Sequence, residues 1–464
     1  MELVLGNQTS ATYILPHHNI LISSISPTPF FTFSNSDAIL TMTVPKPPTR
    51  ILILGSGVVG SSLAHVLSTS SLPPSTTIQV LSPPLTTLTT STSLAPGLVG
   101  QLNALPALTT LAKASVKAYL TLPPGAFSQA GGLEIASSAE GIKILEERLE
   151  KAREAGLEAR LVDSEEIAKL SPQFHVKDGV SRGLYFPTDG VAEPSRIVEA
   201  YQASARANGV EFIEAIALGI KHLNGVVKGI NTSAGFISAD KIIVASGIWS
   251  AELLKDILHI PVIPVGHPYL HGAPRPERGE KSPFVRWPEK GVYGRDHGAC
   301  EGFGTYDHAP LPVAAAEGAE KGWAPEFDSA VERALGLFPS ETRQAMTADG
   351  SRKFNGVFAV TPDGLPVVGP VGDINGLWVA AGVWVTHAMG VAGLVAKMVL
   401  KEEREVEVSS GGEGSEVVEE VVVVDEEFEE LKRVLNPGRF GGRGVEELRR
   451  EAGGRYNDIY NLEE

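Results

Sequence analysis

The chain has 464 residues, of which 43% are hydrophobic and 20% are charged, and its formal net charge is −16. This length allows a dinucleotide-binding domain and a second domain, and the composition is ordinary for a globular protein. The acidic excess argues against nucleic acid or an anionic membrane as the main partner, because both are polyanions.

The cysteine content excludes further kinds of structural and metal site. The single cysteine, Cys300, excludes an intrachain disulfide and a multi-cysteine zinc or iron–sulfur site. No cluster of metal-ligating residues stands out, so we expect no metal. A chain of this kind fits a reducing compartment, and no run of about 18 apolar residues offers a membrane span. We therefore expect a cytoplasmic protein.

Residues 1–45 are rich in Ser, Thr and Pro and contain neither Lys nor Arg. A secretory signal begins with basic residues and a mitochondrial targeting peptide contains arginines, so neither class fits. We expect a disordered extension here, with translation from Met42 as a further hypothesis.

The first predicted core element is a strand over residues 51–54, where four apolar residues in a row indicate burial on both faces. It leads into the G-x-G-x-x-G pattern of residues 55–60 and a helix that continues through Leu67. The three glycines would allow a tight turn, close approach of a pyrophosphate, and close packing of helix on strand. This predicts a dinucleotide site, the alternative being only a tight turn, with candidate residues Gly55, Gly57, Val58, Val59 and Gly60.

Residues 78–82 are predicted to form the second strand. About 20 residues past the glycine motif, dinucleotide folds carry an acid that binds the ribose hydroxyls, and Ser82 stands there instead. A Thr- and Ser-rich stretch follows, and then a loop with proline and glycine that could lie against the cofactor. Its candidate residues are Ser91, Thr92, Ser93, Leu94 and Gly97.

The middle of the chain alternates between helical and strand patterns. A buried strand over 241–247 ends in Ala-Ser-Gly, where the backbone could pass close to a nucleotide, so Gly247 and Trp249 are further candidates. Helices are predicted over 108–119, 140–161 and 194–208, a strand over 210–213, and an antiparallel ribbon from 226–230 and 236–237.

Residues 251–350 contain short apolar segments and many prolines, which suggests the sheet of a second domain. The prolines of 260–270 indicate an edge strand, because proline cannot donate to an interior ladder. His267 and Tyr269 share one face of this strand, as substrate-pocket residues or as a hydrogen-bonded core pair. In the next hairpin, predicted from 291–295 and 301–306, Tyr293 and Arg295 share a face. Arg295 could hold a substrate carboxylate or be structural.

The last core block has strands predicted over 354–360 and 376–382, with a turn-rich connection over 361–370. A long apolar helix then runs to Leu400, and its start carries the candidate cofactor residues Gly382, Thr386, His387 and Met389. His387 could equally be a structural cap. Residues 401–425 are predicted to be an acidic flexible insertion, followed by short helices over 426–434 and 445–452.

Taken together, these motifs resemble the flavin-dependent oxidoreductases of the D-amino-acid-oxidase type over residues 49–400. The branch most resembled is that of the sarcosine and dimethylglycine dehydrogenases and oxidases. The resemblance is carried by residues 55–60, 91–99, the Gly190 region, 247–249, 267–269, 361–364 and 383–387.

The resemblance implies an α/β fold with a Rossmann-like FAD-binding domain and an antiparallel-sheet substrate domain. We expect the first in residues 46–100, 181–250 and 351–400, the second in 101–180 and 251–350, and a helical tail in 426–464. It also implies hydride removal from a carbon next to an amine nitrogen, in a secondary or tertiary amine or an N-methyl amino acid. The acceptor would be oxygen or another carrier. His267, Tyr269 and Tyr293 would keep the amine neutral by disfavouring its ammonium form.

Three departures qualify this resemblance. Leu94 replaces a histidine that is bonded covalently to FAD in the dimethylglycine branch, so noncovalent FAD is expected. Ser82 replaces the ribose-binding acid. Sarcosine oxidases carry a lysine close to the start of the last helix, and no lysine lies near Val391 in this chain. Two alternatives remain: a flavin-fold protein that has lost catalysis and serves as a binding module, and a nicotinamide-linked dehydrogenase.

Overall fold

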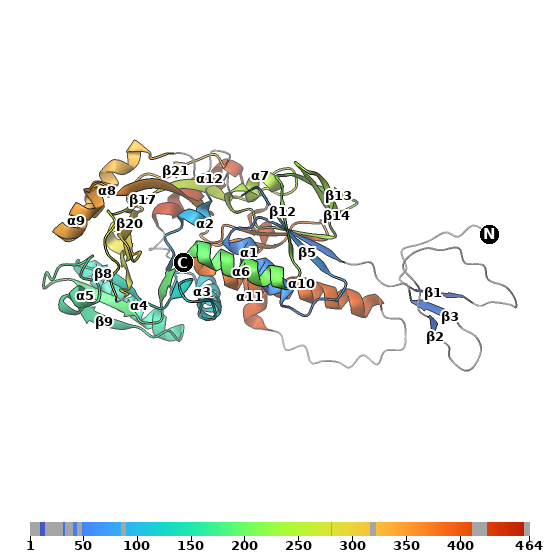
Figure 1. Cartoon of the computed structure of the whole chain (residues 1–464), viewed down its shortest axis with the longest axis horizontal. Helices are drawn as coiled ribbons and strands as arrows, with labels where there is room; N and C mark the ends of the chain where they lie inside the picture. The colour runs from blue at the N-terminus through green and yellow to red at the C-terminus, as the bar shows by residue number, and fades with distance from the viewer. Residues whose placement is uncertain are drawn as a thin grey trace.

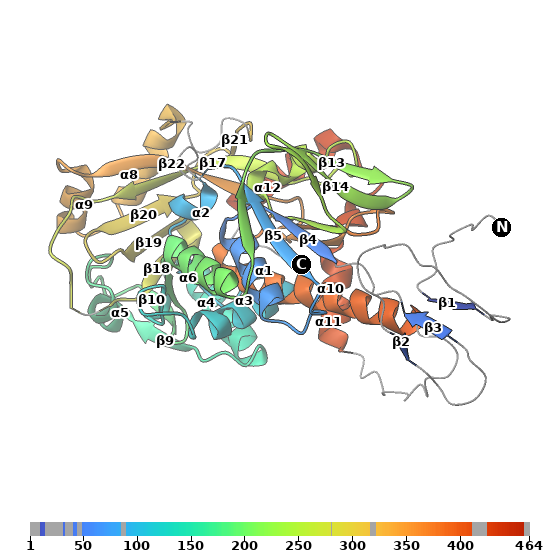
Figure 2. The same cartoon turned by 45° about the vertical axis from the view of Figure 1, so that its right-hand side comes forward.

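The structure is a computed structural model of the chain. It describes residues 10–13, 31–32, 40–43, 49–84, 90–279, 281–315, 322–410 and 425–458. Two sheets dominate it, one of six strands and one of nine, and they lie side by side in Figures 1 and 2. The expected α/β architecture is confirmed.

The six-stranded sheet is built from segments far apart in the chain, in the order β12-β5-β4-β16-β24-β23. Its first five strands are parallel and β23 is antiparallel to β24. Residues 51–54 lie in the interior strand β4 and are almost fully buried, as their apolar run predicts. The strands are β4 (Arg50–Leu54), β5 (Thr77–Ser82), β12 (Glu211–Glu214), β16 (Lys241–Val244), β23 (Val367–Pro370) and β24 (Leu377–Ala381).

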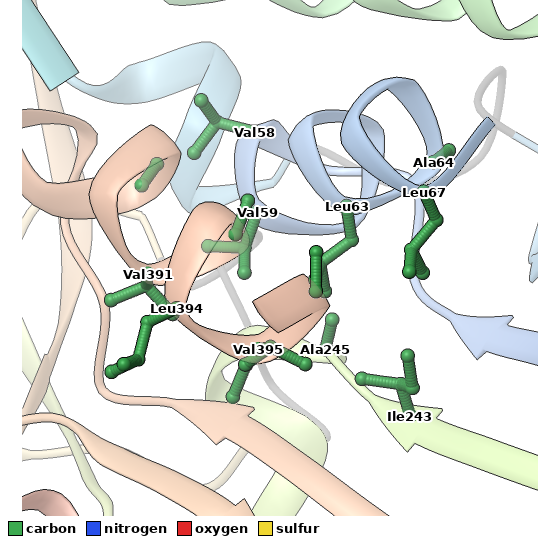
Figure 3. Packing of buried hydrophobic residues seen from close by; sticks show 14 of the residues in the cluster. Val58, Val59, Leu63, Ala64, Leu67, Ile243, Ala245, Val391, Leu394 and Val395 are labelled. Atoms are coloured by element: carbon green, nitrogen blue, oxygen red, sulfur yellow. The ribbon is translucent and has the colours of Figure 1, made fainter. Parts of the chain in front are cut away.

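Helix α1 (Val58–Ser68) follows β4 directly and packs against α6 (Pro194–Ala207) and α10 (Ala388–Ser410). Figure 3 shows Val59 and Leu63 of α1 lying near Val391 and Val395 of α10. Burial of such a side chain stabilises the fold by about 1.5–3 kcal/mol. This apolar core fixes the first turn of α1 at the end of the sheet.

The nine-stranded sheet has the order β21-β17-β20-β19-β18-β8-β10-β9, and β22 also pairs with β17. Its strands are β8 (Gly132–Ala136), β9 (Arg160–Asp163), β10 (Arg182–Phe186), β17 (Ile263–His271), β18 (Phe284–Trp287), β19 (Val292–Asp296), β20 (Glu301–Thr305), β21 (Leu311–Pro312) and β22 (Arg352–Val360). Strands β10 and β22 thus belong to this sheet, although their residues fall in ranges expected for the cofactor domain.

The prediction of an edge strand over 260–270 is wrong, because β17 is paired on both sides. All nine of its residues pair with β22, while on the other side β21 pairs with 265–266 and β20 with 269–271. On the side of β20 and β21, Pro264 and Pro268 lie at positions that neither strand pairs with. No backbone hydrogen bond to a neighbouring strand is required there.

Several other segments differ from the sequence-based expectation. The helix predicted over 140–161 ends at Glu154, because Gly156 takes a left-handed conformation (φ +66°) and β9 follows. The turn-rich connection 361–370 contains β23, and α10 continues past Leu400 to Ser410. The antiparallel ribbon has three strands, β13 (Ala217–Leu223), β14 (Val226–Thr232) and β15 (Gly235–Ser238).

Smaller elements complete the fold. The helices α3 (Pro106–Tyr119), α11 (Glu426–Leu435) and α12 (Val445–Asn457) confirm predicted helices, with α3 packed on α10 and α12 on β17 and β22. The other elements are α2 (Ser91–Leu94), α4 (Ala139–Glu154), α5 (Ser164–Leu170), α7 (Ser250–Leu254), α8 (Asp328–Leu335), α9 (Ser340–Thr347), β6 (Leu98–Val99), β7 (Phe127–Ser128) and β11 (Gly190–Ala192).

Two predictions concern segments that are mostly outside the described residues. Within 1–45, only β1 (Ser10–Tyr13), β2 (Phe31–Thr32) and β3 (Leu40–Thr43) are described, and they pair in one small antiparallel sheet. Within 401–425, residues 411–424 lie outside the described part. The expected disorder of both segments, and translation from Met42, stay predictions.

Candidate functional site

The larger of two adjoining cavities has a volume of about 1070 Å³. It lies where β4, β5, β16 and β24 end, and on its far side are residues of β17 and β22. The carboxyl ends of parallel strands are the usual ligand site in open α/β sheets. The predicted residues that line it are Gly55, Gly57, Val58, Val59, Ser82, Ser91, Thr92, Ser93, Leu94, Gly247, Trp249, His267, Tyr269 and Gly382.

The glycine-rich turn at one end of this cavity cannot accept larger residues. Gly55 has φ +107°, and a Cβ there would lie 2.4 Å from the carbonyl oxygen of Ala245. A Cβ on Gly60 would lie 1.8 Å from the carbonyl oxygen of Gly55, so Gly60 serves helix packing, as predicted. Val58, the first residue of α1, donates its N–H to Thr92 Oγ1 at 3.2 Å. The N-terminus of α1 lines the cavity, and a helix N-terminus is a place where phosphate oxygens bind.

Helix α2 covers the cavity beside this turn. Thr90 caps it by accepting a hydrogen bond from the N–H of Ser93. The buried Oγ of Ser91 has no hydrogen-bond partner among the described residues, so it can donate to a ligand in the cavity. Leu94 lines the same cavity with a side chain that cannot form a covalent bond to a cofactor.

These features fit a flavin dinucleotide. The volume is at the upper end of ordinary ligand sites. The α1 N-terminus offers a phosphate site, and the unpartnered Ser91 hydroxyl offers a further donor. Ser82, predicted to lie at the ribose, lines the cavity with a single hydroxyl, and its role stays a prediction.

The smaller cavity, of about 120 Å³, continues from the larger one. Ala95, Pro96, Phe358, Trp384 and Val385 line both. Among the predicted residues, Gly97, Tyr293, Thr386 and His387 line it. Sequence reasoning missed the other polar and aromatic groups of this cavity, which are Asn103, Glu134, Arg148, Arg286, Tyr306, Phe358 and Trp384.

Three charged side chains, two arginines and one glutamate, line the smaller cavity. Arg148 donates two hydrogen bonds to Glu134, at 2.6 and 2.7 Å, and Arg286 Nη1 lies 4.0 Å from the same carboxylate. The buried carboxyl group of Asp189 also interacts with the charges of both guanidinium groups. Two cationic groups on the wall of one cavity can bind a carboxylate-bearing ligand.

Asp189 belongs to the same charged region, although it does not line the cavity. It is buried and accepts a hydrogen bond from the N–H of Gln101 at 2.9 Å, which ties two loops together. Burial raises the pKa of Asp189 to about 7, while the positive charge of Arg286 opposes this rise.

His387 presents a neutral imidazole to the smaller cavity. Burial, together with the charge of Arg286, lowers the pKa of His387 to about 3. Its Nε2 atom has no hydrogen-bond partner in the part of the chain that the structure describes. His387 can therefore accept a hydrogen bond from a ligand, or donate one, according to its tautomer.

A hydrogen-bonded aromatic cluster joins the two cavities. His267 Nε2 lies 2.8 Å from the hydroxyl of Tyr293, and His267 Nδ1 lies 2.5 Å from that of Tyr456 in α12. Burial and the nearby His308 hold the pKa of His267 well below its usual value, so this imidazole is neutral. The hydroxyl of Tyr269 bonds to His297 Nε2 at 2.7 Å. Of these bonding partners, neither Tyr456 nor His297 was predicted to act here.

Three predicted site residues lie elsewhere. Among the described residues, Arg295, Met389 and Gly60 line neither of the two cavities. Arg295 donates to the carbonyl oxygens of Pro96 (2.6 Å) and Ala192 (2.7 Å) and to Glu193 (2.6 Å), so it holds the loop beside the cavity rather than a substrate. Met389 packs against the apolar core around α1.

The sequence held a signal for some of the missed residues. Glu134 and Arg286 each interrupt an otherwise apolar strand, in Gly132–Ala136 and Phe284–Trp287. A charged residue in a buried strand needs a partner or a ligand. Tyr456 gave no such signal, because nothing local relates α12 to a strand almost 190 residues earlier.

In the described segments, no group of three or more His, Cys, Asp or Glu side chains is placed to hold a metal ion. None of the described helices has the length and apolarity needed to cross a bilayer.

The chain is similar in sequence to known oxidoreductases. The mitochondrial dimethylglycine dehydrogenase of Rattus norvegicus is 28% identical over 292 residues, which is 60% of this chain and 34% of that protein. The 4-methylaminobutanoate oxidase (formaldehyde-forming) of Paenarthrobacter nicotinovorans is 25% identical over 348 residues, 72% of this chain and 41% of that protein. The chain thus spans less than half the length of these relatives.

Solved structures share the fold. The L-proline dehydrogenase of P. horikoshii superposes with a TM-score of 0.67 at 22% identity, covering 76% of this chain and 94% of that one. The glycine oxidase of Bacillus cereus does so with a TM-score of 0.63 at 19% identity, covering 78% and 98%. The model of the family described as FAD dependent oxidoreductase matches residues 50–398. This chain therefore belongs to the FAD dependent oxidoreductase family.

Proposed function

We propose that the protein oxidises a small secondary or tertiary amine that carries a carboxylate, such as an N-methyl amino acid, at the carbon next to the nitrogen. FAD, when bound in the larger cavity, supplies the hydride acceptor. The observation that carries this proposal is the smaller cavity. It combines two guanidinium groups, those of Arg148 and Arg286, with neutral, buried His387 and with tyrosine hydroxyl groups. The final electron acceptor is oxygen or another carrier.

The carboxylate of such a substrate would bind at Arg286. This guanidinium lines the smaller cavity and is only 18% exposed, and Arg148 beside it adds a second positive charge. A charged hydrogen bond in such surroundings contributes about 1.5–3 kcal/mol. Binding there would orient the amine toward Tyr293 and His387 on the other walls.

The amine nitrogen must be neutral before hydride can leave the adjacent carbon. Tyr293, His267 and Tyr269 supply buried neutral partners, and an ammonium ion among them would lose its hydration. The positive charges of Arg148 and Arg286 also oppose an ammonium group in this cavity.

A pair of amines with and without a carboxylate tests the substrate class. Under anaerobic conditions, N,N-dimethylglycine or sarcosine should bleach the bound flavin, and dimethylamine should do so far more slowly. Exchange of Arg286 for Met should raise the apparent KM for the carboxylate-bearing amine by about 10- to 100-fold, the equivalent of one lost charged hydrogen bond. The matched control is Arg333→Met, an arginine that pairs with Asp307 away from both cavities. Equal bleaching by amines lacking a carboxylate would contradict the proposal.

We also propose that FAD is bound without a covalent link, because Leu94 stands where a bonding side chain would be needed. Acid precipitation of the purified yellow protein should leave the colour in the supernatant. Colour retained in the pellet would refute this and indicate a link through another residue. A protein that stays colourless after addition of FAD would instead favour the binding-module alternative.

A further inference from the structure

The guanidinium group of Arg286, in the wall of the smaller cavity, lies directly against the backbone of Gly100. A Cβ built on Gly100 would lie 2.9 Å from Nη1, 3.3 Å from Nη2 and 3.4 Å from Cζ of Arg286. The same guanidinium lies over the ring of Phe284, with Cζ 4.9 Å from the ring centroid, and its Nη1 is 4.0 Å from Glu134 Oε1. The guanidinium thus fills the space that a side chain at position 100 would need.

The backbone at Gly100 does not itself require glycine. Its φ lies outside the left-handed region, unlike that of Gly97 (φ +77°) three residues earlier. A Cβ on Gly97 would also meet the carbonyl oxygen of Ala192 at 2.1 Å, whereas the three atoms nearest to a Cβ on Gly100 all belong to Arg286. Glycine at position 100 therefore serves the side chain of Arg286 rather than the course of the main chain.

The segment that carries Gly100 is buried and held in place, while the guanidinium is the end of a long side chain. The N–H of Gln101 donates to Asp189 Oδ1 at 2.9 Å, and the side-chain amide of Gln101 donates to the carbonyl oxygen of Thr188 at 3.1 Å. Movement of this backbone would break these hydrogen bonds in a buried region, which is costly. A methyl group at position 100 would therefore displace the guanidinium of Arg286 rather than the loop.

We propose that Gly100 is a positioning residue, whose lack of a side chain sets the place of the Arg286 guanidinium and thereby the affinity of the smaller cavity for a carboxylate-bearing amine. This inference rests on the function proposed above. An ordinary contact between a methyl group and Nη1 begins at 3.4 Å, so the substitution Gly100→Ala requires a shift of about 0.5 Å or more. Such a shift weakens carboxylate binding, because a hydrogen bond depends on both distance and direction.

The first test locates the guanidinium directly and needs no substrate. Crystal structures of the FAD-bound wild-type protein and of Gly100→Ala should differ by a displacement of Arg286 Nη1 of about 0.5 Å or more. The hydrogen bond between Gln101 and Asp189 should be present in both. A displaced loop around an unmoved guanidinium overturns the proposal, whatever the substrate is.

The second test measures carboxylate binding with acetate, which has no amine to oxidise, by titration of the visible spectrum of the bound flavin. Gly100→Ala should raise the Kd of acetate and the KM of N,N-dimethylglycine by about 3- to 10-fold, a partial loss of one charged hydrogen bond. The kcat should stay within about twofold of wild type, since binding lost equally in the ground and transition states leaves it unchanged. The matched control is Gly279→Ala, at an exposed loop glycine whose Cβ would meet no atom within 4 Å.

A double-mutant cycle separates positioning of Arg286 from a general effect on the loop. In the Arg286→Met background, Gly100→Ala should leave the Kd of acetate unchanged, because the group that it displaces is gone. If Gly100→Ala weakens acetate binding by the same factor in both backgrounds, the glycine acts through the loop and the proposal is refuted. If the wild-type protein binds acetate but no amine reduces its flavin, the proposed function fails, and the cycle and the crystal structures still decide whether Gly100 positions Arg286.

Discussion

Asp189 is a buried carboxyl group whose burial should be visible in the pH dependence of stability. Its pKa is raised to about 7 in the folded protein, and the ordinary value in the unfolded chain is about 4. A raised carboxyl pKa contributes stability that is complete below the unfolded value and is lost as the pH rises through the folded value. Between about pH 4 and pH 7, this one group should lower the free energy of unfolding by on the order of 4 kcal/mol.

Asp189→Asn should therefore flatten the decline in stability between pH 4 and pH 7. The amide oxygen of asparagine can still accept the hydrogen bond from Gln101, so the loops stay joined. Urea denaturation at several pH values measures the slope, and Asp373→Asn, at an exposed carboxyl, is the control. An unchanged slope in Asp189→Asn would mean that this carboxyl is not responsible.

At the scale of single residues, the sequence predicts which face of a strand a side chain lies on better than it predicts the hydrogen-bond partners of that side chain. Strand alternation places His267 and Tyr269 on one face, and both line the larger cavity. The same rule cannot show that Arg295 is fully engaged by the loop carbonyls of Pro96 and Ala192, because those partners are 199 and 103 residues away in the chain. The roles of all these residues in catalysis stay predictions.

At the scale of elements, the contact between α3 and α10 depends on a glycine. A Cβ on Gly390 would lie 2.3 Å from the carbonyl oxygen of Leu111, whereas a Cβ on Gly393, one turn later, would meet no atom within 4 Å. The N–H of Gly390 also donates to Ser115 Oγ at 2.9 Å. The first turn of α10, which directly follows the cavity-lining residues 384–387, is therefore held close to α3.

Two matched substitutions test this contact. Gly390→Ala should destabilise the protein by about 1–3 kcal/mol, because an overpacked interface must shift. Gly393→Ala should stabilise it by about 0.5–1 kcal/mol, since alanine is the better helix former. Chemical denaturation of both variants with FAD present measures the difference. Similar values for the two would show that α3 and α10 separate readily.

Elements were predicted well where the signal is local and less well where it depends on pairing. The apolar run of 51–54 and the following glycine motif predict a buried strand, a turn and a helix from local sequence alone. All three are found. The prolines of β17 gave the opposite result, because whether a strand is an edge depends on β20, β21 and β22, which follow it in the chain.

At the scale of the whole molecule, the segment 425–458 returns to both sheets. Helix α11 packs on β23, and α12 packs on β17 and β22. Arg439 between them donates two hydrogen bonds to Asp363, at 2.7 and 3.1 Å, and one to the carbonyl oxygen of Leu365, at 2.9 Å. This arginine links the segment to the connection that precedes β23.

Arg439→Ala should therefore lower the free energy of unfolding by about 2–4 kcal/mol, since it removes a largely buried ion pair and leaves Asp363 without its cation. Arg433→Ala removes an exposed pair with Glu430 in α11 and should leave stability unchanged. Thermal unfolding at equal FAD concentrations compares them. An equally small effect of both would show that Arg439 does not hold this segment.

The two-sheet architecture could be inferred from the order of the motifs, but the packing of α12 on β17 and β22 could not. The tail was predicted only as short helices, and its amphipathic pattern does not identify the surface it covers. The charged residues of the smaller cavity likewise come from β8, α4 and β18, three elements that no local sequence pattern relates.

The position of Tyr456 has a consequence for synthesis on the ribosome. It contacts His267 from 189 residues further along the chain. At about 5–20 residues per second, the growing chain exposes His267 and its aromatic neighbours for roughly 10–40 s before Tyr456 has been added. Both sheets can pair during this interval, but the hydrogen bond between His267 and Tyr456 cannot form. A nascent chain can therefore assemble the walls of the larger cavity first, and His267 gains its Tyr456 partner only once α12 has left the exit tunnel.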